Sequence, residues 1–250
     1  MLGSAVVPRV RLLRVLVMLA ACAVLPAGIL SIASDVRGVR MVASARRSDL
    51  EIRIIRRGDW WQLDYARPGV SFATANELHV PAGVAVALRW EKEPAPWIEH
   101  AQYLPSPRGA SMLVADRSVS GARFVSLWPP TWRTLRIVAE PEDAFERWLR
   151  NESQIAAART GDGPRLFENS GCGYCHVIRG VTQSPSQVAP DLTHFARRQT
   201  IAATRFPIKT AYLTGWVAHS RSLKKSSLMP DNAIDPRVLH PLVAYMETLR

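Results

Sequence analysis

Hydrophobic positions follow three different patterns along the chain. Residues 15–33 form an almost continuous apolar run of about 19 positions, roughly the length that crosses a bilayer as a helix. Residues 49–139 contain stretches that approach the apolar–polar alternation of half-buried β-strands, such as LEIRIIRRGDWWQLDY, ELHVPAGVAVALRW and TLRIVA. Near the C-terminus the apolar side chains instead follow the spacing of an amphipathic helix, at Leu239, Leu242, Val243, Met246 and Leu249.

Arginines flank the apolar run on both sides, and those before it lie closest to it. We therefore expect the N-terminus inside and everything after about residue 35 outside the cytoplasmic membrane of a bacterium. The stretch Leu19-Ala20-Ala21-Cys22 resembles a lipoprotein cleavage box, which would lead to acylation of Cys22. An uncleaved signal anchor and simple cleavage with release are the alternatives. Each of the three routes delivers the chain to the periplasmic face.

Charge and cysteine content exclude several other classes of protein. The formal net charge is +11, and residues 1–57 carry ten arginines against three acidic residues. This excess flanks an apolar segment, whereas a nucleic-acid-binding domain would carry a basic face with interleaved aromatics, so no nucleic acid is expected. Only Cys22, Cys172 and Cys175 are present, too few for a disulfide framework or a site with four thiolates.

The string SGCGYCHVIRG contains Cys172, Cys175 and His176 in the C-x-x-C-H pattern of covalent haem attachment. One helical turn brings both thiols to the two vinyl groups of one haem, and the adjacent histidine reaches the iron as an axial ligand. A zinc ribbon would need a second cysteine pair, and a thioredoxin-type pair would need a βαβ setting. A plain disulfide would not need His176. We therefore predict one covalently bound haem c.

The surrounding strings GDGPRLFENSGCGYCH, VAPDL and SLMP, with the final helix, resemble a class I bacterial cytochrome c over about residues 155–250. The resemblance implies that Met229, in the Met-Pro pair, is the second axial ligand. A thioether opposite histidine raises the reduction potential, as suits a carrier that feeds a strong oxidant. His194 and His219 are the remaining candidates for that position.

The same resemblance implies a supporting role for Pro190, whose carbonyl would hold the imidazole of His176 and fix its tautomer. The family usually has glycine before this proline, whereas this chain has Ala189. The sequence therefore does not determine whether the turn has the conformation that the family has here. Basic residues nearby are expected on the surface, either simply solvated or as a docking patch for an acidic partner. They are Arg197, Arg198, Arg205, Lys209, Lys224 and Lys225.

Upstream, the strings GDWWQLDY, TANELHVPAG, WIEHAQYLP and FERWL occur in that order over about residues 50–149. Here the chain resembles subunit II of the haem-copper oxidases, a domain with the cupredoxin fold. Further along, PDLTHFARRQTIAA and LMP are similar to the cytochrome c domain that some bacterial oxidases fuse to this subunit. The two resemblances agree with each other.

The copper chemistry of that family is not expected in this chain. His100 stands where the family has its first histidine ligand, but residues 128–135 contain no cysteine, histidine or methionine. A blue-copper site also needs a thiolate, and no cysteine occurs between residues 23 and 171. We therefore expect no copper, with Trp60 and Trp61 as core or interface aromatics.

Together these patterns predict a multi-domain chain. It has a signal anchor or lipoprotein signal over residues 1–35, a linker over 36–48, an all-β cupredoxin-like sandwich over 49–149 and an all-α class I cytochrome c domain over 150–250. The predicted function is one-electron transfer as a subunit II-like component of a membrane terminal oxidase, without catalysis by this chain alone.

The expected partners are the catalytic subunit of a haem-copper oxidase or related reductase, an electron-donor protein and the membrane. One alternative is a free-standing, membrane-attached periplasmic cytochrome c shuttle. Another is a haem-based ligand-binding protein, which requires Met229 to be displaceable.

Overall fold

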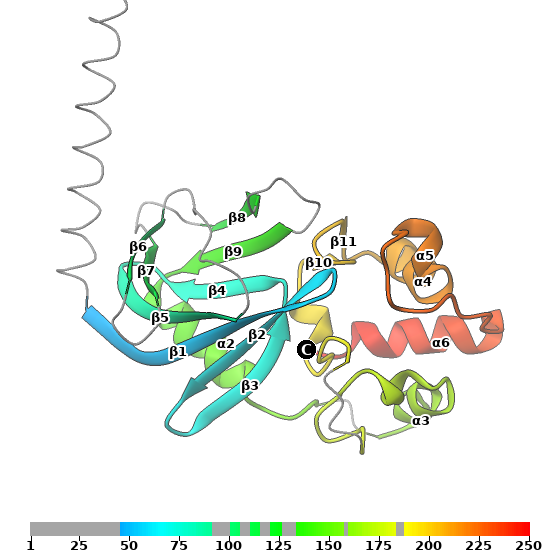
Figure 1. Cartoon of the computed structure of the whole chain (residues 1–250). Coiled ribbons are helices and arrows are strands. Elements are labelled where there is room, and N and C mark those ends of the chain that lie inside the picture. The colour runs from blue at the N-terminus through cyan, green and yellow to red at the C-terminus, as the bar shows by residue number, and fades with distance from the viewer. Residues whose placement is uncertain are drawn as a thin grey trace, which may run out of the picture. The chain divides into compact units, whose positions relative to one another are not determined.

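The computed structural model describes residues 46–91, 101–105, 111–115, 121–126, 134–157, 160–183 and 188–250 (Figure 1). The predicted N-terminal segment with Cys22 lies outside these residues, as do His100 and residues 128–133 of the loop expected to lack copper ligands. Among the described residues no helix has the length and apolar character needed to cross a membrane.

Two sheets make up the first half of the described chain. The larger has the strand order β3-β2-β1-β5-β7-β6 and the smaller the order β4-β9-β8. The larger sheet contains β1 (Arg46–Arg57), β2 (Trp60–Arg67), β3 (Val70–Ala75), β5 (Val84–Glu91), β6 (Ala101–Pro105) and β7 (Ser111–Ala115). The smaller contains β4 (Glu77–Pro81), β8 (Gly121–Ser126) and β9 (Thr134–Glu140). The β1–β5 and β4–β9 pairs are parallel, and the other pairs of these two sheets are antiparallel.

The alternation in β1 and β2 explains how the larger sheet forms. Ile52 and Ile54 are completely buried, whereas Arg53 between them is exposed and pairs with Asp64 across the β1–β2 ladder. Two residues connect these strands, and Gly58 takes a φ of +60° there, a conformation that glycine adopts without steric penalty. This β1–β2 turn places Asp59 and Trp60 at the end of the sheet that faces the C-terminal half (Figure 1).

Helix α2 (Glu142–Glu152) is part of the same core as the strands. Phe145 and Leu149 are buried in one hydrophobic cluster with residues of β1, β2, β4 and β5. Trp148, partly buried, stacks on the ring of His79 at a centroid distance of 4.2 Å. The helix therefore packs against β4 as part of the strand-rich core.

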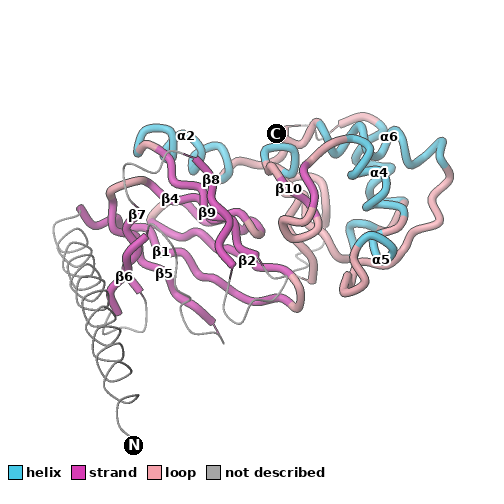
Figure 2. Tube along the Cα trace, turned by 90° about the horizontal axis from the view of Figure 1, so that it is seen from above, coloured by secondary structure: helices cyan, strands magenta, loops and turns pink. Residues whose placement is uncertain are grey.

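The C-terminal half contains α3 (Asp162–Asn169), the 3-10 helices η1 (Cys172–Tyr174) and η2 (Phe195–Arg197), β10 (Thr200–Ile201), β11 (Phe206–Pro207), α4 (Thr210–Ala218), α5 (Ser220–Leu223) and α6 (Pro236–Glu247). Helix α6 packs against α3 and α4. A Cβ atom on Gly163 would lie 2.3 Å from the ring of Tyr245, so glycine is required where α3 crosses α6. Figure 2 shows these helices gathered beside the strand-rich part.

The predicted combination of an all-β sandwich and an all-α cytochrome domain is wrong. The structure is mixed: α2 belongs to the strand-rich core, and β10 pairs with β11 inside the C-terminal half. Residues 45–250 also form one compact unit. The pattern of the sequence failed here for physical reasons. A two-residue ladder is too short to produce alternation, and an amphipathic helix does not reveal which apolar surface it covers.

Candidate haem site

The C-x-x-C-H motif lies directly after α3. Gly171, with a φ of +76°, turns the chain into η1, where Cys175 and His176 donate backbone hydrogen bonds to the carbonyl of Cys172 at 3.2 and 3.0 Å. This single tight turn directs Cys172, Cys175 and His176 to one cavity of about 210 Å³. Pro190 and Met229, the two other residues implied by the cytochrome resemblance, line the same cavity.

The side chain of His176 is held in one tautomer. Its Nδ1 atom lies 2.8 Å from the carbonyl oxygen of Pro190, and because a carbonyl only accepts, Nδ1 carries the proton. Burial lowers the pKa of His176, so the ring is neutral at pH 7 and its Nε2 lone pair can bind a metal. Ala189 fits this turn because its φ is not positive, and its N–H donates to Cys175 O at 3.2 Å.

Met229 lies in the loop between α5 and α6. The hydroxyl of Ser220, at the start of α5, donates to the carbonyl oxygen of Met229 at 2.7 Å. The two histidines that the sequence left as alternatives do not line the cavity. His194 is buried elsewhere with Nε2 3.0 Å from Gln154 O, and His219 is exposed at the end of α4. Met229 is therefore the better candidate for a second axial ligand.

Arg198 supplies a positive charge at the wall of the cavity. Its Nη2 donates to the carbonyl oxygen of Asp191, whereas its Nε is buried and has no hydrogen-bond partner within the part of the chain that the structure describes. Because a guanidinium forms strong charge-assisted hydrogen bonds with carboxylates, the place of Arg198 in the cavity wall suits an anionic group bound there. Haem carries two propionates, so two thiols, a neutral imidazole, a thioether and this guanidinium together fit a covalently attached haem.

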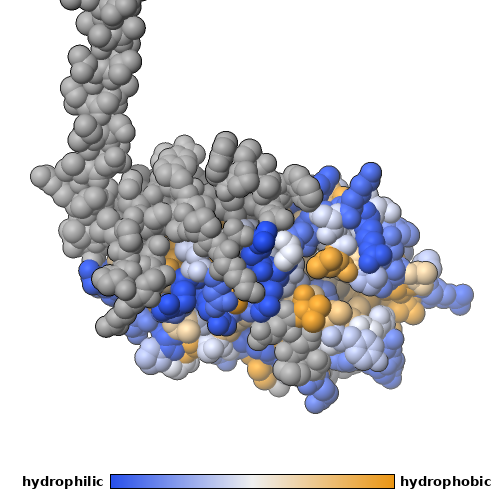
Figure 3. Space-filling view, in the orientation of Figure 1, coloured by the Kyte–Doolittle hydropathy of each residue, from blue (hydrophilic) through white to orange (hydrophobic). Residues whose placement is uncertain are grey.

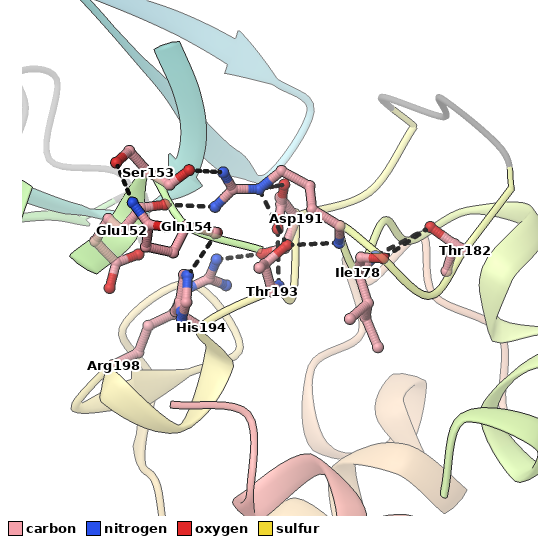
Figure 4. Close-up of polar contacts among 10 residues, drawn as sticks. Glu152, Ser153, Gln154, Ile178, Thr182, Asp191, Thr193, His194 and Arg198 are labelled. Atoms are coloured by element: carbon pink, nitrogen blue, oxygen red, sulfur yellow. Dashed lines mark hydrogen bonds and ion pairs between the residues drawn. The ribbon is translucent and has the colours of Figure 1, made fainter. Parts of the chain in front are cut away.

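A polar network supports the loop that carries Pro190 (Figure 4). The guanidinium of Arg179 donates to the backbone carbonyls of Glu152 and Ser153 and lies 3.5 Å from the Asp191 carboxylate. Thr193 accepts from the Arg179 N–H at 2.9 Å and donates its own N–H to Asp191 at 2.8 Å. The network ties the end of α2 to the residues beside the His176 acceptor.

The strand-rich half also contributes to the cavity, which the sequence did not predict. Asp59 and Trp60 on the β1–β2 turn and Asn76 before β4 are among the lining residues. Trp60 is 9% exposed and clusters with Ala75 and Ala203, so it is the interface aromatic, whereas Trp61 belongs to the strand-rich core. The strings that contain these residues signalled the subunit II resemblance, but a string alone does not show what its side chains face.

Two of the six basic residues expected on the surface are not fully exposed. Lys224 is only 6% exposed, and Arg198 is half-buried and lines the cavity, whereas the other four are exposed. Sequence reasoning missed both because long basic side chains are usually solvated.

No protein-family model matches the chain, and no curated protein matches it either. Within the described ranges, His, Cys, Asp and Glu side chains form no group of three or more that could hold a metal ion. The candidate site therefore rests on the residues of the cavity alone.

Proposed function

We propose that this chain is a one-electron carrier with one covalently bound haem c. It acts as a membrane-attached, subunit II-like component that passes electrons from a donor protein to the catalytic subunit of a terminal oxidase or related reductase. The observation that supports this most is the convergence of Cys172, Cys175, His176 and Met229 on one cavity. Copper is no part of the proposal.

The bound haem would supply an iron that changes its charge by one electron. The residues of this chain determine what that iron can do. His176 and Met229 would both hold the iron, so no position would remain for oxygen and the chain would not be catalytic alone. Cys172 and Cys175 would hold the group covalently, and Arg198 would offset the charge of a propionate.

Apolar residues at the mouth of the cavity support contact with another protein. Val188 and Leu228 both line the cavity and are 70% and 72% exposed. Figure 3 shows apolar surface on the C-terminal part of this face, among hydrophilic side chains. Such a surface lets a partner approach the edge of the haem without first removing a shell of charged groups.

Haem attachment tests the proposal directly. The chain is expressed with a c-type maturation system, and the haem is assayed by alkaline pyridine spectra after acidic acetone extraction. We expect the wild type to retain its haem and Cys172→Ser/Cys175→Ser to lose it. Cys22→Ser, which changes the third cysteine, is the control and keeps it. A wild type without covalent haem contradicts the proposal.

The partner is tested by purifying the tagged chain in mild detergent from its native membranes. We expect a c-type signal together with a- or b-type haem in a fixed ratio, because the chain works beside a catalytic subunit. A c-type signal with no large partner would contradict the oxidase role and leave the periplasmic shuttle.

A further inference from the structure

A buried ion pair joins the β1–β2 turn to the loop that carries Met229. The Nζ atom of Lys224 lies 2.7 Å from Oδ2 of Asp59 and donates to the backbone oxygen of the same residue at 3.1 Å. The side chains of Lys224 and Asp59 are only 6% and 17% exposed. Both residues line the candidate haem cavity.

The turn and the loop meet at two further points. The hydroxyl of Ser226 lies 3.5 Å from Oδ2 of Asp59. A Cβ atom on Gly58 would lie 3.3 Å from Cδ1 of Leu228, so only a glycine at this position leaves that side chain undisturbed. The turn therefore touches the loop at positions 224, 226 and 228, immediately before the candidate ligand.

Two successive hydrogen bonds connect Lys224 to Met229 through Ser227. The N–H of Ser227 donates to Lys224 O at 2.8 Å, and the N–H of Met229 donates to the hydroxyl of Ser227 at 3.2 Å. At the other end of this segment, the carbonyl oxygen of Ser220 accepts a hydrogen bond from the N–H of Lys224 at 2.9 Å. The hydroxyl of Ser220 donates to the carbonyl oxygen of Met229. Hydrogen bonds between Ser220 and residues 224 and 229 thus close the loop on itself, and Asp59 binds it at Lys224.

We propose that Asp59 is a positioning residue for Met229, and that it acts by holding Lys224 in the wall of the haem cavity. The inference rests on the proposed function, since it needs Met229 as an axial ligand. Without the Asp59 carboxylate, Lys224 would be a buried charge without a counter-ion, a state that is strongly unfavourable. The ammonium would then move to solvent and draw residues 224–229 away from the cavity.

The test compares Asp59→Asn with the wild type as full-length holoproteins. Imidazole is the probe, because it binds the oxidised iron only where it displaces the methionine. We expect Asp59→Asn to bind imidazole at least about tenfold more tightly, which corresponds to the coupling energies of residues in contact. The thioether-to-iron charge-transfer band of the oxidised protein weakens in parallel, while the haem content stays at the wild-type level.

Asp64→Asn is the matched control. Asp64 lies on β2 and pairs with the exposed Arg53 rather than with the loop, so imidazole affinity should stay within about twofold of the wild type. Asp59→Glu keeps the charge and is expected to restore most of the wild-type affinity. Lys224→Gln removes the cation that Asp59 binds and leaves the Asp59 carboxylate without its counter-ion. It should therefore also raise the affinity, and the double variant should add little to either.

The outcomes separate this inference from the proposed function. If the wild type holds no covalent haem, the proposed function itself is wrong. If haem is bound and Asp59→Asn has wild-type imidazole affinity, only the positioning role is overturned. If Asp59→Asn does not fold, Lys224→Gln is measured in its place. Wild-type imidazole affinity in that variant also overturns the positioning role of Asp59.

Discussion

At the scale of single residues, the candidate site contains two methionines with different surroundings. Met229 lies in a loop and lines the cavity, and its backbone is held by Ser220 and Ser227. Met246 also lines the cavity but comes from α6 and is packed in the hydrophobic core of the C-terminal half. The two positions therefore offer a matched test of which thioether acts as a ligand.

We expect reduced Met229→Ala to bind carbon monoxide at neutral pH, because the substitution opens an axial position. The reduced wild type and Met246→Leu should not bind it, since both retain the Met229 thioether. Absorption spectra before and after addition of the gas give the measurement. Ready binding by the wild type would instead favour the haem-based ligand-binding protein.

Protonation of the buried Glu152 side chain links stability to pH. Its side chain is 8% exposed, and burial raises its pKa to about 7, although Arg197, Arg198 and Arg179 oppose the shift. The folded protein therefore binds more protons than the unfolded chain between about pH 4.5 and pH 7, and stability from this group falls as the pH rises through that window.

Glu152→Gln should remove this dependence. Relative to the variant, the wild type should lose up to about 3 kcal/mol of unfolding free energy between pH 4.5 and 7. Denaturant unfolding of both proteins at several pH values measures the difference. Parallel curves would contradict a raised pKa at this position.

At the scale of elements, β4 is tied to the segment between η2 and β10. The buried carboxylate of Glu77 accepts hydrogen bonds from the N–H groups of Gln199 and Thr200 at 2.9 to 3.1 Å and from the Thr200 hydroxyl at 2.7 Å. This segment directly follows Arg198. A residue of the smaller sheet thus holds the backbone next to the cavity guanidinium.

Replacing Glu77 by Gln should lower the unfolding free energy by about 2 kcal/mol, because an amide nitrogen would face backbone N–H donors in a buried place. Glu51→Gln is the control, since Glu51 pairs with Arg89 at a surface position that is 44% exposed. We expect less than about 1 kcal/mol there. Urea unfolding of both variants is the measurement, and equal losses would contradict the role given to Glu77.

At the scale of the whole molecule, the two halves share the cavity and the contacts made by Asp59 and Glu77. We therefore expect residues 45–250 of the full-length holoprotein to unfold in one cooperative transition. Differential scanning calorimetry measures this. Two separated transitions would contradict this expectation and favour the separate domains that the sequence pattern predicts.

Some features were readable from the sequence because they depend on neighbours in the chain. The spacing of Cys172, Cys175 and His176 predicts haem attachment without any tertiary information, and the structure brings the three residues to one cavity. Alternation in β1 and helical spacing in α6 likewise indicated real elements, since period 2 and period 3.6 patterns come from local backbone geometry. The position of Pro190 followed from the resemblance to cytochromes c, and the structure places its carbonyl on His176.

Which side chains these elements contact depends on packing between distant parts of the chain. Lys224 and Asp59 are 165 residues apart, and Glu77 and Gln199 are 122 apart, so no local pattern indicates either pairing. Burial of Lys224 depends on a counter-ion supplied by a distant turn, because a charged side chain enters the interior only when it is paired. The same long-range packing turns Met229 to the cavity, leaves His219 in solvent and makes Trp60 part of the cavity wall.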